Sequence, residues 1–213
     1  MLKYKGAIFD ADGTLLDSMQ IWSNAAYESL INRQEYNADN GTSGPGRGQT
    51  PFYLQTEYDI RGLSQDIHIK RRSMLSNFYF YEAQLKDGVI ELLDFFRENG
   101  IKMCVATATD RWLMEPALKR CGVLDYFRQI FTCAEETTNK NSPDIFLSAA
   151  ESLGTTISET LVFEDALYAI KSAKKAGFPV VAVYDYYSGD QQEEIKALAD
   201  YYCLSMHEMI GLL

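Results

Sequence analysis

Short, largely apolar segments recur along the chain, and most of them end at a polar residue. They cover residues 7–9, 101–106, 129–133, 160–163 and 179–183. Strands that are buried on both faces of a parallel sheet have this character, whereas strands of a half-exposed sheet alternate apolar and polar residues. This feature restricts the chain to folds in which helices cover both faces of a parallel sheet.

Helical patterns separate the apolar segments. Apolar residues at helix spacing occupy 89–96 and 112–121, and glycines that commonly end helices follow at Gly100 and Gly122. Strands that alternate with helices in this way predict an α/β fold with a doubly wound, Rossmann-like parallel sheet. Ligands of such folds bind at the carboxyl ends of the strands.

Residues 18–86 interrupt this alternation. Helical patterns cover 19–31 and 64–81, and no strand pattern lies between them. The simplest organisation is a small all-helical cap, residues 18–86, that is inserted after the first strand and lies over the strand ends. Residues 1–17 and 87–213 then form the α/β core domain.

Charge and hydropathy narrow the classes of function. The 213 residues include 20 Lys and Arg and 30 Asp and Glu, a net charge of −10, whereas nucleic acids and anionic membranes bind cationic surfaces. No apolar run reaches the roughly 18 residues of a membrane span, and the acidic residues that begin at Asp10 interrupt any secretory signal. Four cysteines without a CxxC pair match neither a zinc site nor a disulfide scaffold. We expect a cytoplasmic protein without a nucleic acid or membrane partner and, because no heptad seam is present, a monomer.

The ends of the predicted strands carry the residues that can do chemistry. Carboxylate, hydroxyl and ammonium side chains stand at four strand ends: Asp10 and Asp12, Thr107, Lys140, and Glu164 with Asp165. Because the carboxyl ends of parallel strands share one edge of a sheet, we expect these side chains to meet. Four carboxylates stay ionised at close range only around a cation, and an all-oxygen ligand set is typical of Mg²⁺. A metal ion, a lysine and a threonine hydroxyl together predict a site for a phosphoryl group.

The first motif suggests covalent catalysis. Asp10 and Asp12 are two residues apart, and Gly13 allows a sharp turn after them. One carboxylate of such a pair can attack phosphorus while the other exchanges protons with the leaving group. The alternative is that the aspartates only form a turn. Similarly, Glu164–Asp165 could cap the helix that follows, and we expect Asp165 to serve in both roles.

Taken together, these motifs resemble those of the haloacid dehalogenase-like superfamily of phosphotransferases. The family pattern D-x-D-G-T is matched by residues 10–14, its hydroxyl residue by Thr107, its lysine by Lys140 and its acidic pair by Glu164–Asp165. The residues that follow two of these motifs depart from the family pattern: Asn141, after Lys140, replaces Pro, and Ala166, after Asp165, replaces Ser. The insertion is similar to the helical cap of the subgroup that contains β-phosphoglucomutase and many sugar-phosphate phosphatases.

The resemblance implies a role for each motif residue. Asp10 would be the nucleophile that forms an aspartyl-phosphate, and Asp12 would be the general acid and base. Side-chain or backbone groups of five residues would hold the phosphoryl oxygens: Ala11, Asp12, Thr107, Ala108 and Lys140. Four residues would hold Mg²⁺: Asp10, Asp12 through its backbone carbonyl, Asp165, and Glu164 directly or through water.

Two cap residues are candidates for reading the substrate. Arg47, in the glycine-rich stretch 41–48, could bind a second anionic group, although a plain flexible loop is an equal alternative. The stretch nearly matches the phosphate loop GxxxxGK[ST], but Arg47 and Gly48 replace its last residues and no strand precedes it, which argues against a nucleotide site. Trp22 either lines the substrate cleft or fills the seam between cap and core.

The leading hypothesis is a Mg²⁺-dependent phosphomonoester hydrolase for a small phosphorylated metabolite such as a sugar phosphate. The alternative is a phosphohexomutase that resembles β-phosphoglucomutase. Those mutases have a His at the position of Trp22 and a charge-rich loop where this chain has 44–48, and both departures favour a phosphatase. A third hypothesis is a non-enzymatic switch that keeps a phosphate on Asp10. The insertion argues against it, and so does Asp12, which would shorten the lifetime of the phosphoaspartate.

Overall fold

The structure is a computed structural model that describes residues 3–25 and 65–213, with the side chains of 66–68 outside the description. A parallel sheet of six strands in the order β3-β2-β1-β4-β5-β6 forms the centre of the molecule. The strands are β1 (Gly6–Phe9), β2 (Lys102–Thr107), β3 (Ile130–Thr132), β4 (Thr160–Glu164), β5 (Val180–Val183) and β6 (Tyr201–Cys203). The five apolar segments correspond to β1–β5, and the edge strand β6 was not predicted.

The strand order places a switch point beside β1. The chain runs from β1 outward to β2 and β3, and then returns to the other side of β1 to form β4. Connections therefore diverge at the carboxyl ends of β1 and β4, which is where ligands of doubly wound folds bind. The first and fourth predicted motifs both lie at this point.

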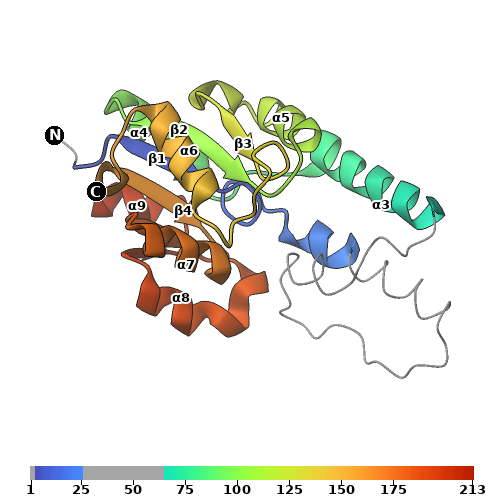
Figure 1. The fold of residues 1–213 in the computed structure, drawn as a ribbon. Coiled ribbons are helices and arrows are strands. Elements are labelled where there is room, and N and C mark those ends of the chain that lie inside the picture. Colours follow the sequence, from blue (N-terminus) through green and yellow to red (C-terminus); the bar gives the residue numbers. More distant parts are fainter. Residues whose placement is uncertain (1–2, 26–64) are drawn as a thin grey trace.

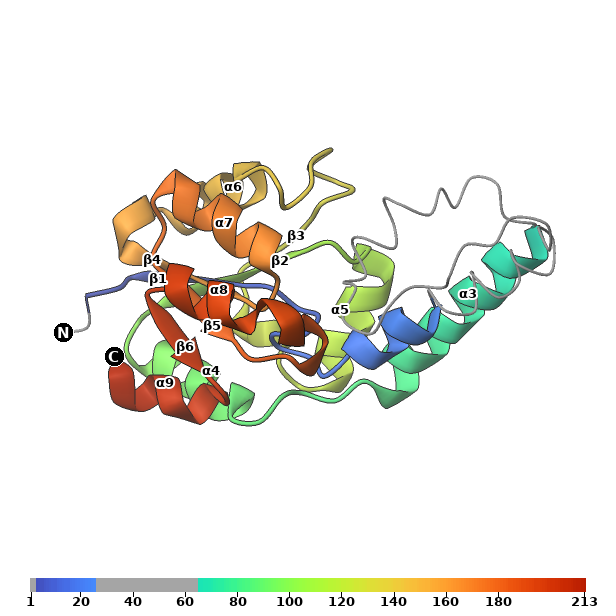
Figure 2. The ribbon, with the colours of Figure 1, turned by 90° about the horizontal axis from the view of Figure 1, so that it is seen from below.

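Helices cover both faces of the sheet (Figures 1 and 2). One face carries α4 (Val89–Glu98), α5 (Arg111–Arg120) and α9 (Met206–Leu212), and the other carries α6 (Asp144–Leu153), α7 (Leu167–Ala176) and α8 (Gln192–Leu198). Short 3₁₀ turns link some of these elements: η3 (Leu124–Tyr126), η4 (Ile157–Glu159) and η5 (Tyr186–Gln191). The doubly wound α/β fold predicted from the sequence is thereby confirmed.

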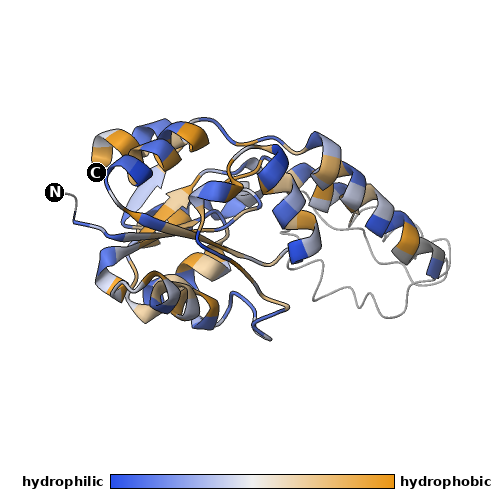
Figure 3. Ribbon diagram, turned by 90° about the horizontal axis from the view of Figure 1, so that it is seen from above, coloured by the Kyte–Doolittle hydropathy of each residue, from blue (hydrophilic) through white to orange (hydrophobic). Residues whose placement is uncertain are grey.

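Neighbouring residues of a strand pack into opposite layers. Phe9 joins the core on the α4 side, where it stacks on Phe163 with a ring-centroid distance of 4.4 Å. Ile8 and Cys104 join the core on the α6 side. In Figure 3 the surrounding helices carry hydrophobic and hydrophilic residues side by side, as expected for elements with one buried face. Burial on both faces explains why the strand sequences are apolar throughout.

The described parts of the insertion are helical except next to the core, at residues 18 and 83–86. Residues 19–25 form a helix, and α3 (Gln65–Asn77) continues into the π-helix η2 (Phe78–Glu82) before the chain re-enters the core. The expected helix over 64–81 is therefore correct in type except for its last turn. The remainder of the helix predicted over 19–31 lies outside the described residues.

The two segments that join the insertion to the core run side by side. The backbone N–H of Asp17 donates to the carbonyl of Gln84, and that of Lys86 donates to the carbonyl of Leu15, both at 2.9 Å. Figure 1 shows helix 19–25 and α3 leaving the same end of the sheet. Within residues 3–25 and 65–213, no helix combines the length and apolarity needed to cross a membrane.

Candidate active site

The turn after β1 positions the first motif. The backbone N–H of Asp10 donates to the carbonyl of Phe163 in β4 at 2.9 Å, which extends the β1–β4 ladder by one residue. Gly13 then adopts a left-handed conformation with φ 82° and donates its N–H to the carbonyl of Leu16 at 2.9 Å. The tight turn places Asp10 and Asp12 at the carboxyl edge of the sheet, above the switch point.

Three carboxylates meet at this edge. Oxygen atoms of Asp10, Glu164 and Asp165 lie within 4.8 Å of one another, and all three residues are buried. The Lys140 ammonium, only 2% exposed, donates to Asp10 Oδ1 and, at 2.6 Å, to Glu164 Oε1. The structure thus brings together the chemical groups predicted at the ends of β1 and β4 and after β3.

Burial controls the protonation of this cluster. Desolvation raises the pKa of Asp10 to about 8; Lys140 opposes this increase, and Glu164 and Asp12 add to it. Desolvation also raises the pKa of Asp165 well above its usual value, with contributions from Glu164 and Asp10. Burial acts to lower the pKa of Lys140, but Asp10 and Glu164 raise it above its ordinary value, so this lysine stays charged.

The acidic cluster fits a divalent cation. Asp165 Oδ2 is buried and has no hydrogen-bond partner among the described residues, although buried polar atoms are nearly always paired. It faces Gly13, where an added Cβ would lie 2.5 Å from this oxygen. A hard cation such as Mg²⁺ would give this unpaired oxygen a partner, together with the neighbouring carboxylate oxygens of Asp10 and Glu164. The buried acidic group is consistent with the predicted metal site.

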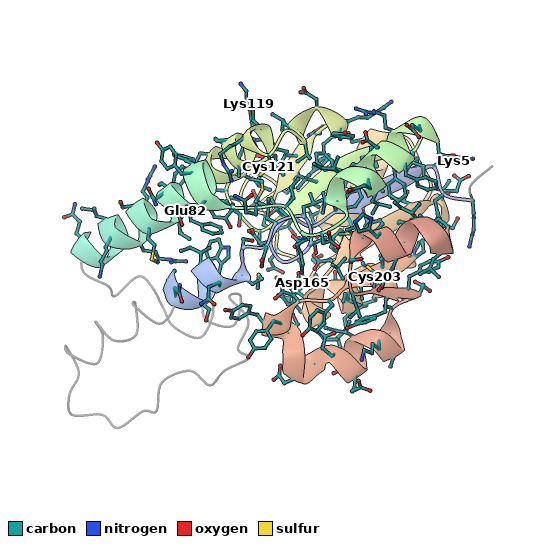
Figure 4. All side chains as sticks on the ribbon, turned by 180° about the vertical axis from the view of Figure 1, so that it is seen from behind. Lys5, Glu82, Lys119, Cys121, Asp165 and Cys203 are labelled. Atoms are coloured by element: carbon teal, nitrogen blue, oxygen red, sulfur yellow. The ribbon has the colours of Figure 1, made fainter. Side chains whose placement is uncertain are left out.

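Glu164, and not Asp165, accepts hydrogen bonds from the backbone just before α7. Glu164 Oε2 accepts the N–H groups of Asp165 at 3.1 Å and of Ala166 at 3.2 Å. Ala166 is the N-cap residue, and within the described chain no side chain caps this helix. The expectation that Asp165 also serves as the cap is wrong, because its carboxylate turns toward Gly13. Figure 4 labels Asp165 near the place where helix 19–25 joins the core.

The Asp12 carboxylate is held by three hydroxyl groups. Ser18 Oγ donates to Asp12 Oδ1 at 2.6 Å, and Thr109 Oγ1 donates to Asp12 Oδ2 at 2.6 Å. The Tyr79 hydroxyl, from η2, also donates to Oδ1. Desolvation and the Asp12 charge raise the pKa of Tyr79 well above its ordinary value, which keeps its hydroxyl protonated as a donor.

None of these three hydroxyl groups was predicted from the sequence to belong to the site. Thr109 lies two residues after the predicted Thr107, and Ser18 lies just beyond the first motif, so both neighbourhoods were visible in the sequence. Tyr79 is 67 residues from Asp12 and belongs to a run of aromatic residues that is typical of side chains packed in a core. Nothing in the sequence around Tyr79 distinguishes a site residue from a packing residue.

The remaining predicted phosphate-binding residues lie at the same edge. Thr107 ends β2, is buried, and accepts the backbone N–H of Thr109 at 3.0 Å. Ala108 follows it and is exposed, whereas Ala11 is buried in the turn between the two aspartates. Their backbone N–H groups therefore belong to the two loops that flank Asp10.

Trp22 packs against other residues of the insertion. It is buried, and its indole Nε1 donates to the Tyr79 hydroxyl at 2.8 Å. The Arg71 guanidinium lies 5.8 Å from the centre of the Trp22 ring. The structure thus places Trp22 in the packed interior beside Tyr79, while Arg47 lies outside the described residues.

Lys86 is a further residue that the sequence did not single out. Its ammonium donates to the carbonyls of Gly13 and Tyr184, both at 2.7 Å, and to Asp185 Oδ2 at 3.0 Å. Lys86 therefore ties the linker that returns from the cap to the turn after Asp12 and to the end of β5.

Comparison with known proteins agrees with this geometry. The haloacid dehalogenase-like hydrolase family matches residues 4–177. The fructose-1-phosphate phosphatase YqaB of Escherichia coli (strain K12) is 30% identical over 192 residues, which cover 85% of this chain and 97% of YqaB. The crystal structure of CbbY from Rhodobacter sphaeroides in complex with phosphate superposes with a TM-score of 0.73 at 25% identity, covering 97% of this chain and 96% of CbbY.

The chain thus belongs to the haloacid dehalogenase-like hydrolases, and within them it is a phosphatase-type enzyme. The resemblance read from the sequence motifs is confirmed. The chain also resembles one region of a longer protein: SUPPRESSOR OF QUENCHING 1 of Arabidopsis thaliana is 29% identical over 188 residues, which cover 85% of this chain but only 18% of that protein.

Proposed function

We propose that this protein is a Mg²⁺-dependent phosphomonoester hydrolase that acts on a small sugar phosphate through an aspartyl-phosphate intermediate. The observation that carries the proposal is the buried group of Asp10, Glu164 and Asp165, whose oxygens lie within 4.8 Å of one another beside the Lys140 ammonium. The activity that names YqaB, hydrolysis of fructose 1-phosphate, supports a sugar phosphate as the substrate class.

The metal would be held at the acidic cluster. We assign its ligands to Asp10, the backbone carbonyl of Asp12 and Asp165, with Glu164 binding directly or through water. Both Glu164 oxygens already accept hydrogen bonds, Oε1 from Lys140 and Oε2 from the two backbone N–H groups just before α7, whereas Asp165 Oδ2 has no partner in the described part of the chain. Bound Mg²⁺ would supply positive charge next to the transferring phosphoryl group.

Asp10 would act as the nucleophile. It must be ionised to attack phosphorus, yet desolvation raises its pKa to about 8. The Lys140 ammonium favours the ionised form, and a cation at the same carboxylate would favour it further. Lys140 and a bound cation together would therefore keep Asp10 ionised, and so nucleophilic, near neutral pH.

The phosphoryl oxygens would be bound by the two loops beside Asp10. We assign this role to the Thr107 hydroxyl, the Lys140 ammonium and the backbone N–H groups of Ala11, Asp12 and Ala108. These donors stabilise the charge that spreads over the equatorial oxygens during transfer. Asp12 would give a proton to the leaving oxygen and later accept one from the attacking water.

The first experiment measures phosphate release from a panel of metabolite phosphate esters, with Mg²⁺ and with EDTA. We expect release from one or a few sugar phosphates, complete loss with EDTA, and loss of about 10⁴-fold or more in Asp10→Asn. Asp125→Asn changes an exposed aspartate in the core domain and should retain full activity. A folded Asp10→Asn protein with wild-type turnover would refute the mechanism.

The same preparations distinguish the alternative functions. Formation of glucose 6-phosphate from β-glucose 1-phosphate with a bisphosphate primer, without phosphate release, would indicate a mutase. A phosphoaspartate that persists for minutes without turnover of any ester would indicate a switch.

A further inference from the structure

We propose that Tyr79, backed by Trp22, is a positioning residue that orients the Asp12 carboxylate so that Oδ2 is the oxygen that exchanges the proton. The inference rests on the proposed role of Asp12 as general acid and base. It adds a hydrogen-bonded relay from the cap, Trp22 to Tyr79 to Asp12, to the residues that the reaction requires.

The two oxygens of Asp12 differ in how many donors they meet. Oδ1 accepts two hydroxyls, those of Ser18 and Tyr79, whereas Oδ2 accepts one, that of Thr109. Each carboxylate oxygen has about two lone-pair directions. Among the described residues, Oδ1 is therefore filled and Oδ2 keeps one direction for a proton.

The direction of the Tyr79 hydroxyl is itself determined. The oxygen accepts the indole N–H of Trp22 at 2.8 Å, so its single hydrogen is left to point at Asp12. The phenol is fully buried, and its ring packs edge-on against Trp22 and Phe78 at centroid distances of 6.5 and 5.4 Å. Chained donors of this kind polarise one another and strengthen the bond to the carboxylate.

The relay joins the two segments by which the cap leaves and re-enters the core. Trp22 belongs to helix 19–25, and Tyr79 belongs to the π-helix η2, where the Ala83 N–H donates to the Phe78 carbonyl at 2.9 Å. Figures 1 and 2 both show helix 19–25 beside the end of α3. Asp12 is thus oriented by Tyr79 only when these two segments pack together.

The relay acts on both proton transfers. In the first, the Asp10 oxygen bonds to phosphorus, the bond from phosphorus to the leaving oxygen breaks, and the proton on Asp12 Oδ2 moves to that oxygen. In the second, a water oxygen bonds to phosphorus, its proton moves to Asp12 Oδ2, and the bond from Asp10 to phosphorus breaks. Asp12 ends in its starting state, and Tyr79 keeps its proton throughout.

The test compares two leaving groups in Tyr79→Phe. A sugar phosphate needs a proton on its leaving oxygen, whereas p-nitrophenyl phosphate releases a stable phenolate without one. We expect kcat/KM for the sugar phosphate to fall about 10- to 100-fold, a part of the full effect of a general acid, and that for p-nitrophenyl phosphate to fall less than about threefold. Tyr126→Phe removes a comparable hydroxyl, which donates to Asp94 at 2.7 Å outside the site, and should change neither value.

A second variant keeps the test decisive if Tyr79→Phe folds poorly. Trp22→Phe removes only the indole N–H donor, and we expect a selective loss of about threefold on the sugar phosphate. Because both residues act through one relay, adding Trp22→Phe to Tyr79→Phe should lower kcat/KM for the sugar phosphate little further. Equal losses on both esters, or no loss on either, would overturn the inference while leaving the hydrolase intact. A wild type inactive on both esters would instead overturn the proposed function.

Discussion

At the scale of single residues, Lys140 permits the acidic cluster to be buried. Its ammonium contacts Asp10 and Glu164, and each of the three side chains is almost fully enclosed. Burying a charge without a partner is costly, and breaking a buried pair leaves such a charge behind. Lys140 is therefore important for stability as well as for the proposed binding of phosphoryl oxygens.

Lys140→Met removes the ammonium but keeps most of the side-chain volume. We expect the free energy of unfolding, measured in urea at about pH 8, to fall by about 3 kcal/mol, because two carboxylates lose their buried partner. Lys171→Met is the matched control, since Lys171 pairs with Glu194 at the surface with both side chains about half exposed. That change should cost less than about 1 kcal/mol. Equal effects of the two variants would contradict this role of Lys140.

At the scale of elements, the turn after β1 and the start of α7 form one unit. Gly13 has φ 82°, and the Asp165 carboxylate occupies the space where a Cβ would stand. A residue with a side chain would be strained at this φ and would also displace Asp165. The turn therefore controls the orientation of a proposed metal ligand from the neighbouring strand.

Gly13→Ala should raise the Mg²⁺ concentration needed for half-maximal activity by about tenfold or more. The reason is that residues which hold a metal ligand in its orientation commonly change metal affinity by this much. Gly122→Ala is the control: its φ is 75°, but nothing lies within 4 Å of the added Cβ. It should lower the free energy of unfolding by about 1 kcal/mol without changing the Mg²⁺ requirement. An unchanged Mg²⁺ requirement in Gly13→Ala would show that the turn does not position Asp165.

Two elements were not predicted for a common reason. The edge strand β6 (Tyr201–Cys203) pairs with β5 alone among the described strands, and its three residues are too few to show a strand pattern. The π-turn of η2 interrupts a run whose spacing is helical, and it forms where the chain packs against α5 and the Asp12 turn. Both depend on neighbours that are distant in the sequence.

At the scale of the whole molecule, the buried carboxylates link folding to pH. The folded state holds Asp10 with a pKa of about 8, against 3.8 for the ordinary side chain. Because the folded pKa is raised, the folded state binds a proton that the unfolded chain releases. This contribution to stability is complete below about pH 4 and is lost as the pH rises through about 8.

Without metal, the free energy of unfolding should therefore fall by about 2 kcal/mol between about pH 6 and pH 8 from Asp10 alone. The raised pKa of Asp165 changes stability in the same direction. Millimolar Mg²⁺ should reduce this decline, because a bound cation stabilises the ionised carboxylates. Urea unfolding of wild type and Asp10→Asn, with and without Mg²⁺, measures the contribution of Asp10 and that of the metal. The free energy of unfolding of the variant should fall less between about pH 6 and pH 8 than that of the wild type. A wild type whose decline is the same with Mg²⁺ as with EDTA would argue against a metal at this cluster.

The amino-acid sequence was enough to predict the parallel sheet, its two helical layers and the gathering of the motif residues at one edge. These features depend on local periodicity and on the rule that parallel strands end at a common edge. Three features became apparent only in the folded structure. Glu164 accepts the two backbone N–H groups just before α7, Asp165 Oδ2 has no partner among the described residues, and Tyr79 donates to Asp12. These contacts depend on which rotamers fit when segments far apart in the chain pack together, and no local pattern encodes that choice.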